Sequence, residues 1–305
     1  MKKYVIFAPK YNESNGGVIC LHYLAHLINE LGREAYICPI FENFEINKIN
    51  FKRPFLKTLY SKLIDRFRAF HVNEGFNNNI LQDPSLIKGG DEWVAVYPEV
   101  VFGNPLGAKH VVRWLLHNPG FHTGKIYYGP DELYFKYHHG FSDFKYLNSI
   151  QSPNPLHLIY YPLHLYNMNG VARERSGTAY CLRKGRDRNI QHDLTDSILI
   201  DGKSHQEISE IFKHVKTFIS YDLYTTYSSF AALCGCDSVV MPIEGVAKES
   251  WYPNVENRYG VAYGFDDINA ALSTRHLLLD EVHRDHEANI KHVEAFLTES
   301  DQYFS

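Results

Sequence analysis

The sequence has no long apolar run and no large excess of charge, and each absence excludes a class of protein. No stretch approaches the length of a membrane span, and the apolar run near the N-terminus is too short for a signal peptide. A net charge of −4 and a pI near 6.5 argue against a general nucleic-acid binder. We therefore expect a cytoplasmic protein without a nucleic-acid partner.

Cysteines are few and odd in number, which argues against a disulfide framework. The sequence has five, mostly in apolar surroundings, and the "CGC" at Cys234 and Cys236 has the spacing of neither a zinc site nor a redox motif. We expect all five to be reduced core residues.

The first half of the chain begins as a βαβ unit. A predicted strand at residues 4–8 leads to a polar loop that ends in Gly16 and Gly17, and a helix with apolar periodicity follows and stops at Gly32. A second strand is predicted at residues 35–38. Glycines at a helix N-terminus allow the backbone to come close to a ligand there.

The second half restarts the same alternation. Strands are predicted at residues 178–182, 217–221 and 238–241, with helices at 204–215 and 228–234. The sequence therefore predicts an α/β protein with two Rossmann-like domains facing across a cleft. The N-terminal domain is expected at 1–165, the C-terminal domain at 166–284, and a helix at 285–305 that packs on its own domain or back on the N-terminal one.

The segment "YTTYSSFAALCGCDSVVMP" places six hydroxyl residues between the end of a strand and the first turn of a helix. Such a position suits either helix capping or the binding of a phosphate. The basic residues Arg183 and Lys184 follow another strand end, and ligands in such sheets lie beyond the carboxyl ends of strands. Phosphate binding is therefore favoured over simple capping. Of the six, the candidate phosphate ligands are Tyr224, Thr225, Thr226, Ser228 and Ser229.

The order of these parts resembles the glycosyltransferases of the GT-B fold, especially the large retaining family that uses nucleotide-sugar donors. "NESNGG" looks like the family's first loop, and "LRKG" stands where the family has a basic pair near the diphosphate. The resemblance implies that Gly16, Gly17, Arg183 and Lys184 bind the donor, which is a substrate, so no cofactor is expected.

"FISYDLYTTYSSFAALCGCDSVVMP" is similar to the family signature of an acid, seven residues and a second acid. Asp222 stands at the first acid, with Tyr221 beside it, but Phe230 stands at the second. In the family the second acid commonly holds the ribose hydroxyls, so this chain departs from the family in donor recognition. Asp222 is expected either to bind the donor sugar or to cap the helix.

Three further residues follow predicted strands. His117 matches a region where the family has a histidine near the donor sugar, and it could act as a base or be structural. Glu99 could deprotonate the acceptor hydroxyl if the enzyme inverts, or lie in a surface turn. Glu244 could reach the donor sugar or lie in a solvated loop.

Turnover is predicted to need no metal ion. Metal-dependent single-domain glycosyltransferases use an Asp-x-Asp pair after a strand, whereas Asp266 and Asp267 are contiguous and stand late in the chain.

The expected function is transfer of a sugar from a nucleotide-sugar to a saccharide or lipid-linked saccharide in surface polysaccharide or lipopolysaccharide biosynthesis. A nucleotide-sugar epimerase and a non-catalytic sugar-binding partner subunit are the alternatives. Residues 51–70 predict a basic amphipathic helix that either packs on its own domain or contacts anionic lipid at the inner face of the membrane.

Overall fold

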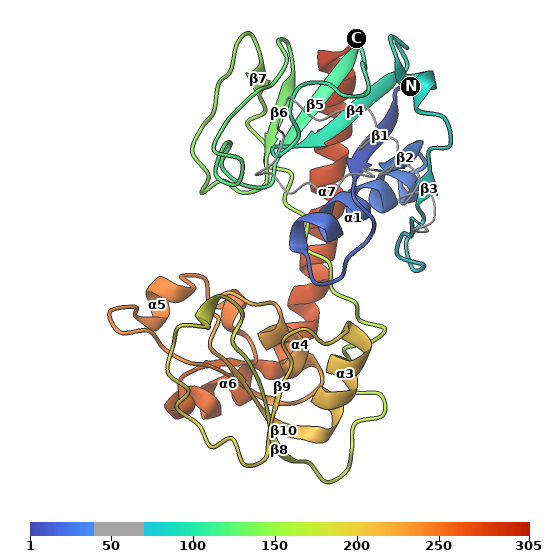
Figure 1. Cartoon of the computed structure of the whole chain (residues 1–305). Coiled ribbons are helices and arrows are strands. Elements are labelled where there is room, and N and C mark those ends of the chain that lie inside the picture. Colours follow the sequence, from blue (N-terminus) through green and yellow to red (C-terminus); the bar gives the residue numbers. More distant parts are fainter. Residues whose placement is uncertain (40–69) are drawn as a thin grey trace, which may run out of the picture. The chain divides into compact units, whose positions relative to one another are not determined.

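The computed structural model describes residues 1–39 and 70–305, which form two compact units (Figure 1). Unit 1 comprises Met1–Tyr160 and Glu287–Ser305, and unit 2 comprises Tyr161–His286. The first crossing between units therefore falls close to the predicted boundary at residue 165. The basic helix predicted over residues 51–70 lies outside the described residues except for its last position.

Unit 1 is built on a seven-stranded sheet in which every neighbouring pair is parallel, in the order β3-β2-β1-β4-β5-β6-β7. Its strands are β1 Lys3–Ala8, β2 Ala35–Pro39, β3 Asn79–Ile80, β4 Trp93–Pro98, β5 His110–Leu115, β6 Leu133–Lys136 and β7 Ile150–Gln151. Its helices are α1 Gly16–Glu30 and the 3₁₀ helix η1 Pro84–Ile87, together with the end of α7.

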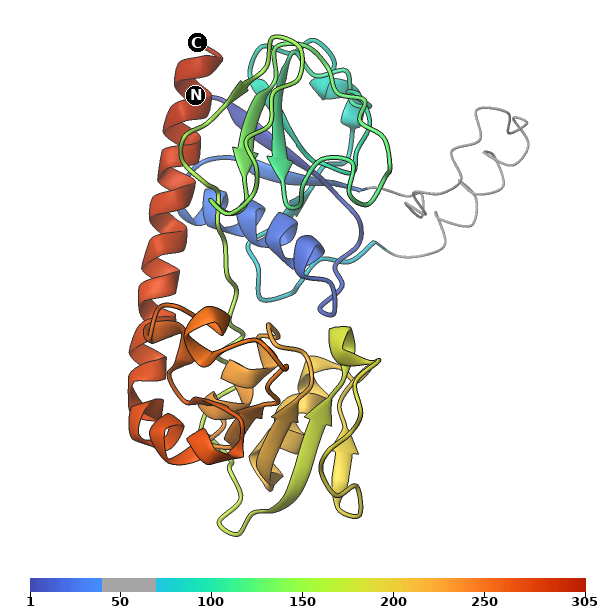
Figure 2. The same cartoon turned by 90° about the vertical axis from the view of Figure 1, so that its left-hand side faces the viewer.

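Both faces of this sheet are covered, as a parallel sheet requires. Alternate residues of β1 point to opposite faces. Tyr4 and Ile6 pack with α1, which lies along the sheet in Figure 2, whereas Val5 packs with residues around η1. The strands β4 and β5 are buried at every position, so they form the centre of the unit.

Unit 2 contains a five-stranded sheet that is also parallel throughout, in the order β12-β11-β10-β8-β9. Its strands are β8 Ser176–Cys181, β9 Ser197–Leu199, β10 Val215–Ser220, β11 Asp237–Val240 and β12 Val261–Tyr263. Its α-helices are α3 His205–His214, α4 Tyr227–Leu233, α5 Lys248–Trp251 and α6 Ile268–Thr274, with the start of α7. Its 3₁₀ helices are η2 Arg183–Gly185, η3 Glu256–Arg258, η4 Phe265–Asp267 and η5 Arg275–Leu277.

Local sequence explains where the unit 2 helices begin and end. Ser204 and Glu207 form a reciprocal capping box at the start of α3. Gly235 follows the end of α4 with a φ of 81°, the left-handed conformation that glycine adopts most readily. Helices α3 and α4 cover one face of the sheet and α6 packs on the other.

The last helix, α7, runs continuously over Leu278–Tyr303 and contributes to both cores (Figure 1). Leu278 and Val282 pack within unit 2, whereas Val293 and Phe296 are buried in the main core of unit 1. The helix thus adds residues from the end of the chain to the core of unit 1. The other members of that core come from residues 1–160.

These observations confirm the predicted fold class of two Rossmann-like α/β units. The strand order 3-2-1-4-5-6-7 in unit 1 and the order equivalent to 2-1-3-4-5 in unit 2 are the two common doubly wound arrangements. All five cysteines are free; four are buried and Cys20 is half-buried, as predicted.

Candidate active site

The strand order of unit 1 reverses between β1 and β4, and Glu99 is the first residue after β4. Ligands of open parallel sheets bind beyond the carboxyl ends of the strands at such a reversal. Glu99 is only 5% exposed, and its Oε2 accepts a hydrogen bond from the Leu116 N–H at 3.0 Å. From the sequence, Glu99 could also have been part of a surface turn. The structure instead places a buried carboxyl at this edge.

The environment of Glu99 favours its neutral form more than water does. Burial raises its pKa from the usual 4.5 to about 7, although the N–H groups of Leu116 and His117 and the charge of Arg113 act in the opposite direction. Near neutral pH the carboxyl is therefore divided between its two states, which is what a general base requires.

A buried network fixes the backbone around Glu99. The Tyr128 hydroxyl donates to the Glu99 carbonyl at 2.6 Å, and the Arg113 guanidinium lies 4.4 Å from the centre of the Tyr128 ring. Arg113 is fully buried and makes a bidentate ion pair with Glu132, with its shorter contact at 2.6 Å. Two planar hydrogen bonds hold the guanidinium in one orientation.

His117 lies two residues after β5 and is half-buried. Its Nδ1 accepts a hydrogen bond from the Asn118 N–H at 2.8 Å, and its ring stacks on Phe121 with centroids 4.0 Å apart. In this arrangement the neutral imidazole carries its proton on Nε2. His117 is therefore placed as a hydrogen-bond donor, and not as the base that the sequence left open.

Gly16 and Gly17 are the first two residues of α1, after the N-cap Asn15, whose side chain accepts from the Val18 N–H. The first N–H groups of a helix have no intrahelical acceptor. A Cβ on Gly17 would lie 3.7 Å from the side chain of Leu116. Unit 1 thus brings Gly17, Glu99 and His117 together around Leu116, at the carboxyl edge of its sheet.

The strand order of unit 2 reverses between β8 and β10, and the basic pair follows β8. Arg183 has a positive φ of 43°, which is strained for a residue with a side chain. The Asp201 carboxylate accepts from the N–H groups of Leu182 and Arg183, at 3.3 and 2.8 Å, and so holds this turn. Backbone strain of this kind is common at functional sites, so it marks Arg183 as a candidate ligand-binding residue.

The Arg183 side chain extends toward the end of β10. Its Nε is 3.9 Å from Asp222 Oδ2, and its guanidinium lies 5.2 Å from the centre of the Tyr227 ring. Just over a third of the side chain is exposed, whereas Asp222 is 5% exposed. Lys184 is exposed to solvent. The two cations therefore remain accessible at the edge where a phosphate would bind.

Gly185 allows two strand ends to approach closely. A Cβ at this position would lie 2.1 Å from the Tyr221 carbonyl oxygen, which no side chain can tolerate. The Arg188 guanidinium also donates to that carbonyl, at 2.7 Å, and to the carbonyls of Met241 and Pro242. Arg188 thus satisfies backbone groups at the ends of β10 and β11.

Tyr221, just before the hydroxyl segment, and Ser228 within it are buried. Tyr221 is 1% exposed, and its hydroxyl interacts with the Gln191 N–H at 2.7 Å and with His192 Nδ1 at 2.9 Å. Ser228 is 5% exposed, and its buried Oγ has no hydrogen-bond partner among the described residues. Both side chains are buried in this structure, and the Tyr221 hydroxyl is already engaged, so neither offers a solvent-exposed group to a donor.

The other members of the segment remain accessible. Tyr224 and Thr226 are exposed, and Thr225 and Ser229 are half-exposed. Thr226 occupies the N-cap position of α4 without a capping bond from its side chain, whereas Thr225 Oγ1 accepts from the Tyr227 N–H at 3.4 Å.

Asp222 does not cap α4. Its Oδ1 accepts from the Tyr224 N–H at 3.1 Å, within the turn that precedes the helix. The carboxylate therefore lies between this turn and Arg183, where it orients both.

Phe230 belongs to the core and not to the ligand edge. Its ring stacks on Tyr166, with centroids 4.3 Å apart, and it is 4% exposed. An acid at this position would be buried among aromatic rings, so the packing explains the departure from the family signature. Glu244 is exposed in a turn before Gly245, as the solvated-loop interpretation predicts.

No sequence motif points to the residues that support these sites. Arg113 and Glu132 stand within or next to buried strands, and only the rarity of charges in such strands marks them. Asp201 follows the end of β9 with no pattern that links it to Arg183.

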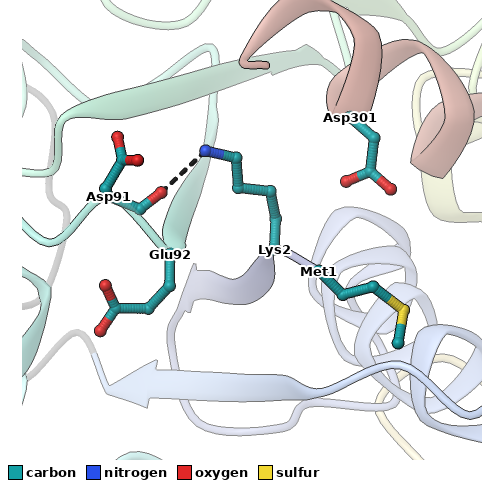
Figure 3. Close-up of a pocket in the computed structure, with 5 residues that line it drawn as sticks. All are labelled: Met1, Lys2, Asp91, Glu92 and Asp301. Atoms are coloured by element: carbon teal, nitrogen blue, oxygen red, sulfur yellow. Dashed lines mark hydrogen bonds between the residues drawn. The ribbon is translucent and has the colours of Figure 1, made fainter.

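A small pocket of about 440 Å³ opens at the opposite edge of the unit 1 sheet, before β1 and β4 (Figure 3). Its lining residues are Met1, Lys2, Asp91, Glu92 and Asp301. The Lys2 ammonium donates to the Asp91 carbonyl at 2.8 Å, and Asp301 is bound by Arg33. Asp91 is paired with Lys109 and His110, and the pocket lies away from the strand reversal.

Within residues 1–39 and 70–305, no three His, Cys, Asp or Glu side chains are placed to hold a metal ion together. The helices in the same part of the chain include none that is long and apolar enough to cross a membrane.

Comparison with known proteins gives a fold likeness only. No protein-family model and no curated protein sequence matches the chain. Among solved structures, the crystal structure of Acinetobacter baumannii MurG matches with 10% identity and a TM-score of 0.31, over 97% of this chain and 99% of that one. This likeness is too low to carry an argument, so the proposals below depend on the geometry described above.

Proposed function

We propose that the protein is a glycosyltransferase that moves a sugar from a nucleotide-sugar donor to a saccharide acceptor. The observation that carries the proposal is the buried Glu99 carboxyl at the strand reversal of unit 1, with a pKa near 7. The accessible cations Arg183 and Lys184 at the strand reversal of unit 2 support a donor that carries phosphate.

In the proposed reaction Glu99 removes the proton from an acceptor hydroxyl. The oxygen then attacks the anomeric carbon of the donor sugar, while the bond between that carbon and the diphosphate oxygen breaks. The bonding electrons leave with the nucleoside diphosphate, and the proton remains on Glu99. Such a direct displacement inverts the anomeric configuration, and a carboxylate base near neutral pKa suits it.

Unit 2 would stabilise the charge that develops on the leaving diphosphate. Arg183 and Lys184 supply fixed cations, and Thr225, Thr226 and Ser229 supply hydroxyl donors. Helix α4 has only seven residues, so we assign most of the stabilisation to the cations and little to the helix terminus. Asp222 would orient Arg183 across the 3.9 Å that separates them.

The position of Phe230 favours a second candidate function. Its core packing leaves no acid at the place where the resembled family binds ribose, which would suit a sugar-binding partner subunit without catalytic activity. The Glu99 carboxyl and the exposed cations favour the enzyme, because a binding subunit needs no carboxyl with a pKa near 7.

The test is incubation of the protein with a panel of nucleoside diphosphate sugars, with and without mixed saccharide acceptors. Release of nucleoside diphosphate that depends on acceptor and falls in Glu99→Gln supports the transferase. An isomerised donor would indicate an epimerase. Binding of donors in a thermal-shift assay without any turnover would indicate a binding subunit.

The acceptor and its pathway remain part of the proposal. A saccharide or lipid-linked saccharide of a surface polysaccharide or lipopolysaccharide suits a cytoplasmic transferase that uses nucleotide-sugars. The basic segment at 51–70, which would contact the inner face of the membrane, lies almost entirely outside the described residues.

A further inference from the structure

Unit 1 carries a cluster of histidines at the carboxyl edge of its sheet, which we name the histidine cluster. Its rings form a nearly continuous series. The members are His117, His122, His138, His139, His157 and His292.

Ring contacts connect five of the six members, and His139 follows His138 directly in the chain. His117 lies 5.0 Å from His122 and 5.6 Å from Phe141, and His138 lies 6.4 Å from that same Phe141 ring. His138 is in turn 5.6 Å from His157, which lies 6.4 Å from His292 on α7. The cluster thus extends from His117, which follows the Leu116 that donates to Glu99, to His292 on α7.

Several of these rings are open to solvent. His122, His138 and His139 are exposed, and the other three are half-buried. Phe121, stacked on His117, is 67% exposed and offers an apolar face. An exposed aromatic face beside hydrogen-bond donors is suited to a sugar ring.

The ionisable groups that act on His157 can carry only positive charge. His157 packs against Tyr137, and the charged groups that act on it among the described residues are His138, His139 and His292. Burial, reinforced by these three, lowers the pKa of His157 to about 4. Burial and His139 also lower the pKa of His292, against its hydrogen bond to the Pro155 carbonyl.

Two carboxylates of the segments around the cluster have other partners. Asp143 is paired with Lys136, which also donates to the Phe141 carbonyl, and Glu99 accepts from Leu116. Protonated histidines here would therefore gain from an external anion.

We propose that the histidine cluster binds an oxyanion, the phosphate or carboxylate group of an acidic saccharide acceptor. The exposed rings of His122, His138 and His139 donate N–H groups to the anion, His138 through Nε2 because its Nδ1 accepts from the Gly140 N–H at 2.9 Å, and Phe121 contacts the sugar ring. The inference rests on the proposed function in one respect, that the ligand is the acceptor. Binding of the anion itself is independent of turnover. Because the anion relieves repulsion among the imidazoles, binding and protonation favour one another.

The test uses sulfate as a probe of phosphate-like groups and glucuronate as a probe of carboxylates, since neither changes charge between about pH 6 and pH 8. Binding is followed through the histidine ring resonances in NMR spectra of the full chain. We expect affinity about tenfold higher at the lower pH, and a rise of the cluster's histidine pKa values on binding. Preference for one probe identifies the group.

The variant His138→Gln/His139→Gln removes two exposed donors and should weaken binding at the lower pH by about tenfold. The exposed His276→Gln in unit 2 is the matched control. Equal affinity at both pH values, or unchanged affinity in the double variant, would overturn the proposal. Loss of transfer in Glu99→Gln with anion binding intact would separate the two proposals, because that binding needs no donor or base.

Discussion

At the scale of single residues, Glu99 sets the expected pH dependence. If its ionised form is the base, kcat/KM should rise with pH through a midpoint near 7. Glu99→Gln keeps an acceptor for the Leu116 N–H but removes the base, so turnover should fall by about 10²–10⁴-fold and lose that midpoint. Initial rates across pH measure both effects. A Gln variant with the wild-type rate and midpoint would exclude Glu99 as the base.

The same carboxyl should also affect stability. Its folded pKa lies above its usual value of 4.5, so between 4.5 and about 7 the folded state binds more protons than the unfolded state. Stability from this group is therefore present below the lower value and is lost as pH rises through the higher one, by roughly 3 kcal/mol. Glu99→Gln should be less destabilised on going from acid to neutral pH than the wild type in urea unfolding. Parallel stability curves for the two proteins would contradict this.

Gly185 gives a prediction about backbone packing at the unit 2 reversal. In Gly185→Ala the new Cβ would meet the Tyr221 carbonyl at 2.1 Å, and this backbone group cannot move without disturbing the end of β10. We expect a loss of about 1–3 kcal/mol or more in the free energy of unfolding. Gly16→Ala is the control for stability, because its Cβ would meet no described atom within 4 Å. Equal stability of the two variants would show that the approach is not required.

At the scale of elements, apolar periodicity and punctuation by glycine predicted the central strands and helices well. The predicted strand at residues 4–8 is β1, and the helix that stops at Gly32 is α1. These elements could be predicted because burial on a helix or strand face leaves a periodic pattern. The candidate site could be predicted only in part. Arg183 and Glu99 were identified because they stand at strand ends, where ligands of parallel sheets bind.

Apolar periodicity does not predict how deeply the residues at those strand ends are buried. Tyr221 and Ser228 were expected to contact a donor, but both are buried by tertiary packing that no local pattern encodes. The raised pKa of Glu99 has the same origin, because it depends on long-range contacts between the ends of β4 and β5.

The last helix gives a prediction at the element scale. Phe296 is fully buried in unit 1 and packs against Tyr4 and Phe135, with ring centroids 5.4 and 5.1 Å away. Phe296→Ala should destabilise unit 1 by about 3–5 kcal/mol. Leu279→Ala, on the same helix but 45% exposed, should cost little. Hydrogen exchange would localise the loss, and protection of β1 and β4 unchanged by Phe296→Ala would contradict the assignment.

At the scale of the whole molecule, we propose a division in which unit 2 binds the donor and Glu99 of unit 1 removes the acceptor proton. This division makes turnover independent of metal. Arg183 and Lys184 would provide the charge that a divalent ion provides in other transferases. Transfer should therefore continue at an unchanged rate in excess EDTA. Activity that is lost in EDTA and restored by magnesium or manganese would contradict this.

The same division predicts that donor binding and proton removal can be lost separately. Arg183→Ala/Lys184→Ala should weaken nucleoside diphosphate binding by about 2–4 kcal/mol, because two charge-assisted contacts are lost, whereas the exposed neighbour Arg186→Ala should have little effect. Glu99→Gln should leave that affinity unchanged. Because one set of substitutions acts on donor binding and the other on proton removal, their effects on kcat/KM should add within about 0.5 kcal/mol in the combined variant. Calorimetric titration and initial rates measure these quantities. Unchanged affinity in the folded Arg183→Ala/Lys184→Ala variant would remove unit 2 as the nucleotide site, and strong non-additivity would show that one group depends on the other.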